Sequence, residues 1–403
     1  MNICGIICEY NPFHNGHALH LRKTRELLGG DTAIMCVMSG NFVQRGDFSM
    51  LRKHARARCA VTGGADLVVE LPLPYACAGA ERFARGAVDI LNGAGVVTHL
   101  SFGSECGDAG AIARTAEALD SRAFAQAFFD ADDRGETFAV RRQRALGLVC
   151  PGSAALLSSP NNTLGIEYVR ALHRTGADII PVSVPRAGAA HDSTYAVGGI
   201  ASASHIRALI KNGQAFDGYM PAQAVEALSQ ECAAGRAPVF AEEAERTVIS
   251  RLRTLDAETL ARLPDMSEGL HMRICNAIQE GVTLDGICGA AKVKRYTYAR
   301  IRRALIHACL GVYEDGIPAA PPYIRVLAFN NRGRRLLNAI NERSSLPVVT
   351  KPASVRRLGG QPLAVFEAEA RATDLYVLAQ SVVEPCGAEW RSTPIYVDVP
   401  PEL

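Results

Sequence analysis

Two histidines, His14 and His17, follow shortly after the apolar run of residues 3–8, with Gly16 between them. Glycine has no Cβ, so a phosphate group can approach the backbone there. The segment comes after a predicted strand and a Pro12-containing turn, and it opens a helix whose first N–H groups attract an anion. Two imidazoles at that point can donate hydrogen bonds to an α-phosphate as negative charge grows on it. The pattern predicts nucleotide chemistry that needs no enzyme nucleophile.

The alternative is that His14 and His17 are ordinary helix-start histidines. A second segment favours the nucleotide interpretation, because Ser202 and Ser204 open a predicted helix that carries Arg207, directly after the last strand of the same domain. Serine hydroxyls and a helix N-terminus suit a triphosphate, and an arginine can neutralise its charge. Serine is also the usual N-cap of any helix, so this second pattern gains its value from being paired with the first.

Other phosphate and nucleophile motifs are absent from the sequence. It contains no G-x-x-x-x-G-K-[ST] loop and no G-x-S-x-G elbow. Its twelve cysteines never form a C-x-x-C pair, so we expect no structural zinc site and no other protein-held metal. Free thiols in apolar runs favour a reducing compartment, and no apolar stretch approaches a membrane span. We expect a soluble cytoplasmic protein, and its net charge of +2 decides nothing about nucleic acid.

The chain of 403 residues is long enough for more than one hydrophobic core. Residues 1–215 alternate β-rich runs with helical patterns, which predicts a doubly wound α/β domain on a parallel sheet. Residues 216–316 lose the β-branched runs and predict a helical domain, and residues 317–403 predict a small α+β domain. The expected strands are residues 3–8, 32–38, 66–70, 97–102, 178–184, 324–329 and 346–349, and the expected helices include residues 51–61, 82–91, 166–172 and 336–340.

The best candidate for nucleic acid lies in the helical region, at residues 292–303. This stretch holds six basic residues, no acidic residue and two tyrosines, which suits phosphate contacts and base stacking. A charged run can equally be the solvated face of a helix. The candidate RNA-binding residues are Lys292, Lys294, Arg295, Tyr296, Tyr298 and Arg300. Near the first motif, Arg45, Lys53 and Arg56 are possible anion ligands, of which we favour Arg45.

Several segments of the chain resemble the tRNA(Met) cytidine acetate ligase family, a branch of the H-x-G-H nucleotidyltransferases. They are Glu9–His17, Ser39–Gly46 after the second strand, Phe102–Glu105 at the end of the fourth strand, Pro160–Gly165, the serine segment at Ser202–Arg207, and Lys294–Thr297. The resemblance extends over nearly the whole chain. It implies a nucleotidyltransferase fold of the HIGH type for the first domain and tRNA binding for the helical domain. The third serine-segment position, Ser204, stands where threonine is common in the family, and it keeps the hydroxyl.

The resemblance also implies an activity and a set of residues. The enzyme would use ATP and acetate to form acetyl-adenylate, and would then acetylate N4 of the wobble cytidine of elongator tRNA(Met). The implied catalytic residues are His14, His17, Ser204 and Arg207, and any Mg²⁺ would be held by phosphate oxygens and water. The implied ATP contacts are Ile7, Cys8, Glu9, Tyr10, Asn11, Pro12, Phe13, His14, Asn15, Gly16, His17, Ala18, Leu19, His20, Gly103, Asn162 and Arg186.

Two other functions remain open at this stage. A small-molecule adenylyltransferase would use the same first domain, but it would need a phosphorylated acceptor and ignore tRNA. A non-catalytic protein that binds ATP or RNA would bind nucleotide without any turnover. The basic stretch argues against the first alternative, and the paired phosphate motifs argue against the second.

Overall fold

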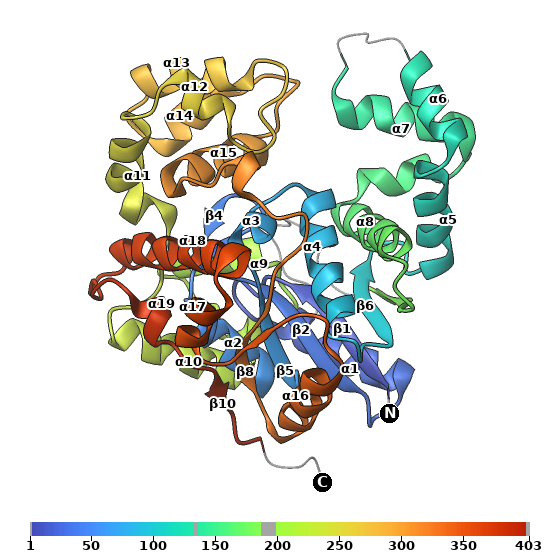
Figure 1. Cartoon of the computed structure of the whole chain (residues 1–403), viewed down its shortest axis with the longest axis vertical. Helices are drawn as coiled ribbons and strands as arrows, with labels where there is room; N and C mark the ends of the chain where they lie inside the picture. Colours follow the sequence, from blue (N-terminus) through green and yellow to red (C-terminus); the bar gives the residue numbers. More distant parts are fainter. Residues whose placement is uncertain (1, 132–135, 187–198, 400–403) are drawn as a thin grey trace.

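The protein is built around one sheet of eight strands, seen in a computed structural model that describes residues 2–131, 136–186 and 199–399 (Figure 1). The strands lie in the order β10-β8-β5-β2-β1-β6-β7, and β9 pairs with β8 outside this path. Their bounds are β1 Ile3–Cys8, β2 Ala33–Ser39, β5 Leu67–Leu71, β6 His99–Ser104, β7 Ile180–Pro185, β8 Ile324–Phe329, β9 Val348–Val349 and β10 Ile395–Tyr396. Every expected strand is present, with ends that differ by at most a few residues.

The five strands that the first predicted domain contributes to this sheet, β1, β2, β5, β6 and β7, are all parallel to one another. Chain order reverses at β1, which has β2 on one side and β6 on the other. In a doubly wound sheet this reversal opens a crevice at the carboxyl ends of the two strands, where ligands bind. Figure 1 shows the N-terminus at the far end of β1, so these carboxyl ends face the end of the molecule that carries α6, α7 and α12–α14.

Helices cover both faces of the sheet because its central strands are apolar on both sides. In β2, Met35 and Val37 pack into one core, and Cys36 and Met38 pack into the other. The first core is covered by α4 (Ala80–Gly93), α5 (Ala109–Leu119), α8 (Pro160–Thr175) and α16 (Asn331–Arg343). The second is covered by α1 (Asn15–Leu28), α2 (Lys53–Thr62), α9 (Ala203–Lys211) and α10 (Ala222–Ala233). Helices α6 (Arg122–Asp130) and α7 (Phe138–Val149) pack outside α5.

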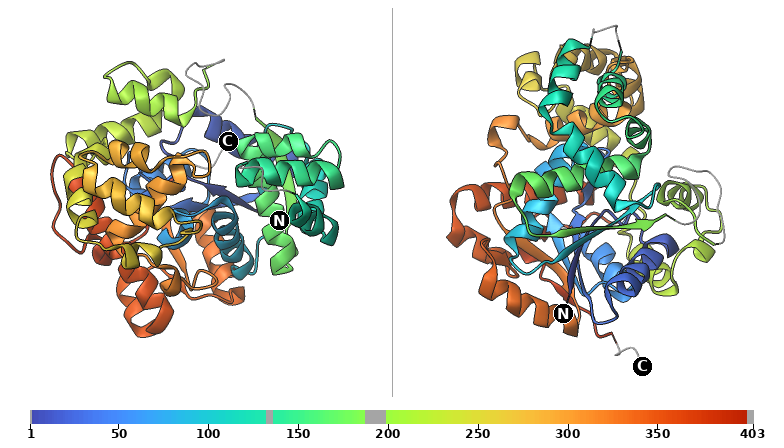
Figure 2. Two further views of the ribbon diagram at one scale, coloured as in Figure 1. Left: turned by 90° about the horizontal axis from the view of Figure 1, so that it is seen from above. Right: turned by 90° about the vertical axis from the view of Figure 1, so that its right-hand side faces the viewer.

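Residues 216–316 are helical in all their regular elements, as expected. Beyond α10 they form α11 Glu245–Leu252, α12 Ala257–Ala261, α13 Leu270–Glu280, α14 Leu284–Ala291 and α15 Tyr298–Leu310. Their shared core also takes in Phe42 and Phe48 from a short hairpin of β3 (Phe42–Val43) and β4 (Asp47–Phe48), and Tyr376 from α18 (Gly360–Tyr376). The right-hand view of Figure 2 shows α12, α13 and α14 above the sheet.

The last third of the chain returns to the sheet. β8 pairs antiparallel with β5, and β10 and β9 then pair parallel with β8. The segments at residues 1–215 and 317–403 therefore share one sheet, and the boundaries that we drew between them stay predictions. Short helices α3 Leu73–Ala76, α17 Val355–Leu358 and α19 Ala388–Arg391 complete the fold. Among the residues that the structure describes, no helix has the length and apolar character needed to cross a bilayer.

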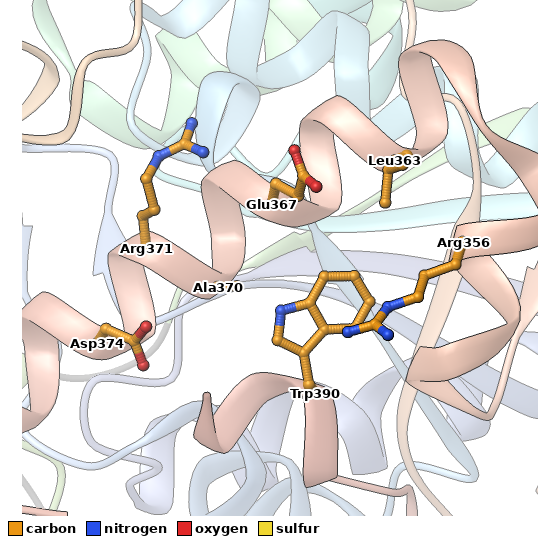
Figure 3. Close-up of a pocket in the computed structure, with 7 residues that line it drawn as sticks. All are labelled: Arg356, Leu363, Glu367, Ala370, Arg371, Asp374 and Trp390. Carbon is orange, nitrogen blue, oxygen red and sulfur yellow. The ribbon is translucent and has the colours of Figure 1, made fainter. Parts of the chain in front are cut away.

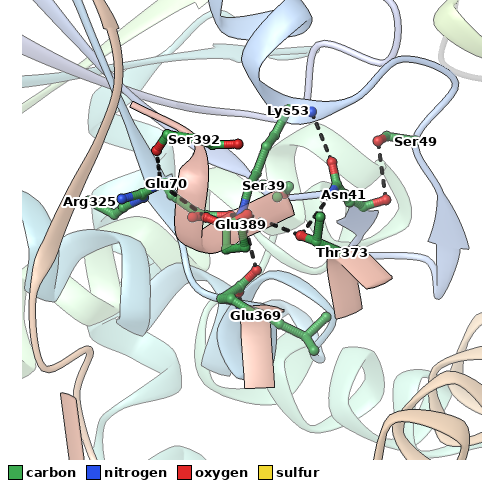
Figure 4. Close-up of polar contacts among 12 residues, drawn as sticks. Ser39, Asn41, Ser49, Lys53, Glu70, Arg325, Glu369, Thr373, Glu389 and Ser392 are labelled. Carbon is green, nitrogen blue, oxygen red and sulfur yellow. Dashed lines mark hydrogen bonds and ion pairs between the residues drawn. The ribbon is translucent and has the colours of Figure 1, made fainter. Parts of the chain in front are cut away.

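A buried ionic cluster joins α2 to the C-terminal helices (Figure 4). The Lys53 ammonium lies 2.6 Å from Glu70, 2.8 Å from Glu389 and 3.6 Å from Glu369. Arg325 adds a second cation 3.1 Å from Glu389, and all five side chains are at most 3% exposed. Burial alone would raise the pKa of Glu389, but Lys53 and Arg325 bring it down to about 2. Burial and the neighbouring Glu70 raise the pKa of Glu369 well above its ordinary value.

Candidate active site

His14 and His17 form a reciprocal cap at the start of α1. The Gly16 N–H donates to His14 Nδ1 at 3.0 Å, and the His14 N–H donates to His17 Nδ1 at 3.3 Å. The two rings stack with their centroids 3.6 Å apart. The histidine spacing therefore satisfies two N–H groups that a helix leaves without intrahelical partners.

Both rings are neutral, and their hydrogens are placed by the cap. Burial lowers the pKa of His14 to about 3, with further lowering by the cations Arg186 and Arg207. Burial also lowers the pKa of His17 well below its ordinary value, with His14 and Arg186 as lesser causes. Because each Nδ1 accepts a backbone hydrogen, each neutral ring carries its proton on Nε2. The site thus offers two imidazole N–H donors beside two guanidinium cations.

The start of α9 is fastened to the start of α1. The Arg207 Nη1 donates to the Asn11 carbonyl at 2.7 Å, and the Asn15 amide donates to the carbonyls of Gly199 at 3.2 Å and Gly218 at 3.1 Å. Ser202 caps α9 by accepting the His205 N–H at 3.1 Å, and its hydroxyl lies 3.1 Å from that of Ser204. The structure thus brings the two predicted phosphate segments together.

The carboxyl end of β6 supplies the third side of the site. An added Cβ on Gly103 would lie 3.3 Å from the Arg186 side chain, so the arginine packs closely against this glycine. Asn162, which is 3% exposed, accepts the N–H groups of Glu105 and Cys106 at 2.9 and 3.1 Å. Glu105 in turn accepts the Asn162 N–H at 2.8 Å. Asn162 therefore fixes the loop after β6 onto α8, a role that its position at a helix start did not reveal.

Part of the predicted ATP set lies in the core with its side chains. Tyr10 and Phe13 are 2% and 1% exposed, and their rings pack edge to face with centroids 5.0 Å apart. Asn11 accepts the Met50 N–H at 2.8 Å. Cys8 is also buried, whereas Ile7, Glu9, Asn15, Gly16, Ala18, Leu19 and His20 are partly exposed. Tyr10, Asn11 and Phe13 can therefore meet a nucleotide through their backbone, while their side chains hold the loop.

The Ser101 hydroxyl is a polar group at the site that the sequence did not indicate. His20 lies 3.0 Å from the Ser101 hydroxyl, which lies 2.8 Å from that of Thr24. Burial lowers the pKa of His20 to about 4, with Arg186 as a further cause. Ser101 sits inside β6, where a small polar residue shows no motif, so only the pairing of β6 with β1 reveals its contact with α1.

The three cations near the first motif have different places. Arg56 is fully buried and donates to the main-chain carbonyls of Glu9, Ser39, Gly40 and Leu51, which ties the ends of β1 and β2 together. Lys53 belongs to the ionic cluster. Arg45 is exposed at the turn between β3 and β4, and it remains the candidate anion ligand of the three.

The predicted RNA-binding residues divide into two groups. Lys292, Lys294, Arg295 and Tyr298 are exposed, although the Tyr298 hydroxyl lies 3.1 Å from Asp285. Tyr296 is 3% exposed, and its hydroxyl donates to the Glu268 carbonyl at 2.5 Å. The Tyr296 ring is therefore packed in the helical core and offers no open face for base stacking in this structure, so a contact of this residue with RNA stays a prediction.

Arg300 is also committed to the protein. Its Nε donates to the Asp265 carbonyl at 3.0 Å, and its guanidinium lies 5.3 Å from the Tyr296 ring centre. Its contacts fold the loop before α13 against α15. The Lys292 ammonium donates to the carbonyls of Val293 at 3.1 Å and Tyr296 at 2.8 Å. Of the predicted basic residues, this leaves Lys294 and Arg295 as the main candidates for contact with RNA.

A groove of about 510 Å³ lies apart from these residues, along α17, α18 and α19 (Figure 3). In it the Arg356 guanidinium lies 4.7 Å from the ring centre of Trp390. It is lined by Arg356, Leu363, Glu367, Ala370, Arg371, Asp374 and Trp390, none of which belongs to the predicted site.

Comparison with known proteins gives whole-chain matches. A family model described as HIGH Nucleotidyl Transferase matches residues 1–388. The tRNA(Met) cytidine acetate ligase of Acetivibrio thermocellus is 38% identical over 395 residues, which cover 94% of this chain and 95% of that protein. The protein of the same name from Alkaliphilus metalliredigens is 37% identical over 401 residues, covering 94% of each.

Solved structures agree with the sequence matches. The crystal structure of apo Thermotoga maritima TmcAL (form I) is similar with a TM-score of 0.94 and 31% identity, covering 99% of this chain and 100% of that one. A second crystal form of that protein, described as bound with alpha-thio ATP, is similar with a TM-score of 0.93 and 30% identity, at the same coverage. The predicted HIGH-type α/β fold is confirmed.

Proposed function

Because this chain belongs to the HIGH nucleotidyl transferases, and within them to the tRNA(Met) cytidine acetate ligases, we propose that it activates acetate with ATP and acetylates tRNA(Met). The observation that supports this function most directly is the pair of neutral, stacked imidazoles of His14 and His17, with Arg186 and Arg207 beside them. Two N–H donors and two cations suit an α-phosphate that gains charge during attack. The relative crystallised with alpha-thio ATP supports ATP as the nucleotide.

In the first step an acetate oxygen attacks the α-phosphorus of ATP, and the bond to the β-phosphate oxygen breaks. His14 and His17 donate their Nε2 hydrogens to the α-phosphate oxygens, and pyrophosphate leaves toward Ser204 and Arg207 at the start of α9. No side chain has to give or take a proton in this step. Positioning and electrostatics therefore supply the rate enhancement.

In the second step N4 of the wobble cytidine attacks the acetyl carbonyl carbon of acetyl-adenylate. The new C–N bond forms as the C–O bond to AMP breaks, and the amine releases a proton. Lys294 and Arg295 would contact the phosphates of elongator tRNA(Met).

Mg²⁺ would be held by the phosphate oxygens and by water. Within the described ranges of the chain, no group of three or more His, Cys, Asp or Glu side chains is arranged so that it could hold a metal ion, so the protein supplies no ready ligand set. Mg²⁺ bound to nucleotides commonly takes few protein ligands, and this chemistry fits the site. Its contribution would be to neutralise charge on the triphosphate.

Acetate-dependent exchange of labelled pyrophosphate into ATP tests the first step. We expect exchange that requires acetate, needs no tRNA, and falls about 10²-fold or more in His17→Ala. The matched control is His173→Ala, which removes an exposed histidine from the last turn of α8. Nucleoside analysis of unmodified tRNA(Met) after incubation tests the second step. Absence of exchange in the parent protein would refute acetyl-adenylate formation, and an acceptor-dependent exchange with a phosphorylated metabolite would favour an adenylyltransferase.

A further inference from the structure

The β3–β4 hairpin is held between the active-site loop and α15. Gly46, at its turn, has a φ of +73°, and a Cβ added there would lie 2.4 Å from the Arg303 backbone nitrogen. The hairpin backbone therefore presses directly on the backbone of α15. Such close approach leaves no space for any side chain at this position.

We call this contact between the hairpin and α15 the joint. Side-chain contacts extend it on the side of α15 and on the side of the active-site loop. Arg302 donates to the Asp47 carboxylate at 3.1 Å, and Arg303 donates to the Gln44 carbonyl at 3.4 Å. On the other side of the hairpin, the Gln44 N–H donates to the Glu9 carboxylate at 2.8 Å. Glu9 begins the loop that leads to His14. The chain of contacts thus runs from α15 to the loop that carries the two histidines.

The same helix end carries the exposed basic residues. Thr297 caps α15, and Lys294 and Arg295 lie in the turn before it, where Val293 and Tyr296 form an isolated bridge. Arg302 lies about one helical turn, or roughly 6 Å, beyond the first residue of α15. A phosphate bound at Lys294 or Arg295 is therefore fixed relative to the hairpin, because the basic turn and the hairpin are both attached to the first part of α15.

The contacts that hold Arg207 and α9 in place are separate from this joint. Arg207 is held by Asn11, and α9 is fastened through Asn15 to Gly199 and Gly218, all within residues 11–218. None of these hydrogen bonds involves α15 or the hairpin. A change at the joint should therefore leave the ATP site in place and move the helical segment relative to it.

We propose that Asp47 and Arg302 are positioning residues for acetyl transfer to RNA, and that they take no part in acetate activation. This inference rests on the proposed function. The ion pair is suited to the task because its side chains are 31% and 27% exposed, so it can be altered without opening a core. Misplacing the acceptor amine by about 1 Å can cost up to about 10²-fold in the rate of transfer.

The test uses Asp47→Arg, Arg302→Asp and the double variant in which the charges are exchanged. Three rates are measured: pyrophosphate exchange without tRNA, single-turnover transfer from preformed acetyl-adenylate at saturating tRNA(Met), and tRNA dissociation. We expect each single variant to lower transfer about tenfold or more, with exchange within twofold of the parent. The exchanged pair should recover at least a third of the parent transfer rate. Asp47→Asn, which keeps the shape of the side chain, should show a smaller loss in the same direction.

The matched control is the Arg82–Glu314 ion pair, which joins α4 to the end of the helical segment at 2.9 Å without touching the hairpin. Arg82→Glu should leave both rates within twofold. Equal losses of exchange and transfer in the Asp47 and Arg302 variants would overturn the inference, as would unchanged transfer or a loss explained by tRNA affinity alone. A parent protein without exchange would overturn the proposed function itself, and this inference with it.

Discussion

Removal of Lys53 from the buried ionic cluster should destabilise the protein by several kcal/mol. At neutral pH we expect Lys53 and Arg325 to balance Glu70 and Glu389, with the proton on Glu369, because burial and Glu70 raise the pKa of Glu369 well above its ordinary value. Lys53→Met leaves one buried carboxylate without a cation. The cheapest response is for that carboxyl group to take up a proton, which at pH 7 and an ordinary pKa of 4.5 costs about 3.4 kcal/mol. Measured losses for broken buried ion pairs are similar, at about 3–5 kcal/mol.

Urea denaturation followed by circular dichroism measures this loss. The penalty should shrink by about 1.4 kcal/mol for each pH unit between 7 and 4.5. The sign follows from proton binding, because a carboxyl group whose pKa is raised in the folded variant stabilises it at low pH and loses that contribution as pH rises. The double variant Lys53→Met/Glu70→Gln removes the excess charge and should recover most of the loss. A single variant within 1 kcal/mol of the parent, or a double variant less stable than the single one, would refute the charge balance.

Three further outcomes are expected. Burial brings the pKa of His14 to about 3, so its neutral form stabilises the fold fully above pH 6.5 and progressively less as pH falls toward 3. The urea midpoint should therefore drop over this pH range, and it should drop less steeply in His14→Gln. Arg295→Ala should weaken tRNA binding in a filter assay and reduce the salt dependence of that binding. Tyr296→Phe should leave tRNA affinity unchanged and lower only the unfolding midpoint. The reverse pattern would contradict the burial of Tyr296. Asn15→Ala should raise the KM for ATP about fivefold in exchange by loosening α9, and an unchanged KM would show that the Arg207 contact suffices.

The strands of the sheet could be predicted because their sequences are apolar runs bounded by turns. β1 and β8 match the expected ranges at both ends, since both are short, strongly apolar and followed by polar residues. The pairing of β8 with β5 could not be predicted, because local pattern says nothing about partners more than 250 residues apart. β10 has only two residues, too few for a periodic signal.

The site was predictable where neighbouring residues in the sequence explain why a residue type occurs at its position. His14 and His17 were recognised through their spacing, and that spacing is what allows the reciprocal cap. Lys53 gave the opposite case, since a lysine near a helix start usually points to solvent. Its three glutamate partners come from β5 and from residues 369 and 389, so nothing near it in sequence marks it as buried.

The antiparallel pairing of β8 with β5 also affects how the chain folds during its synthesis. During synthesis β5 leaves the ribosome more than 250 residues before its neighbour, so one edge of the nascent sheet stays open for most of translation. An open apolar edge invites pairing with other chains. A fragment that ends at residue 215 would keep that edge permanently, and we expect it to aggregate where the full chain does not. The C-terminal strands thus cover the open edge of β5, and they are the last strands of the sheet to be synthesised.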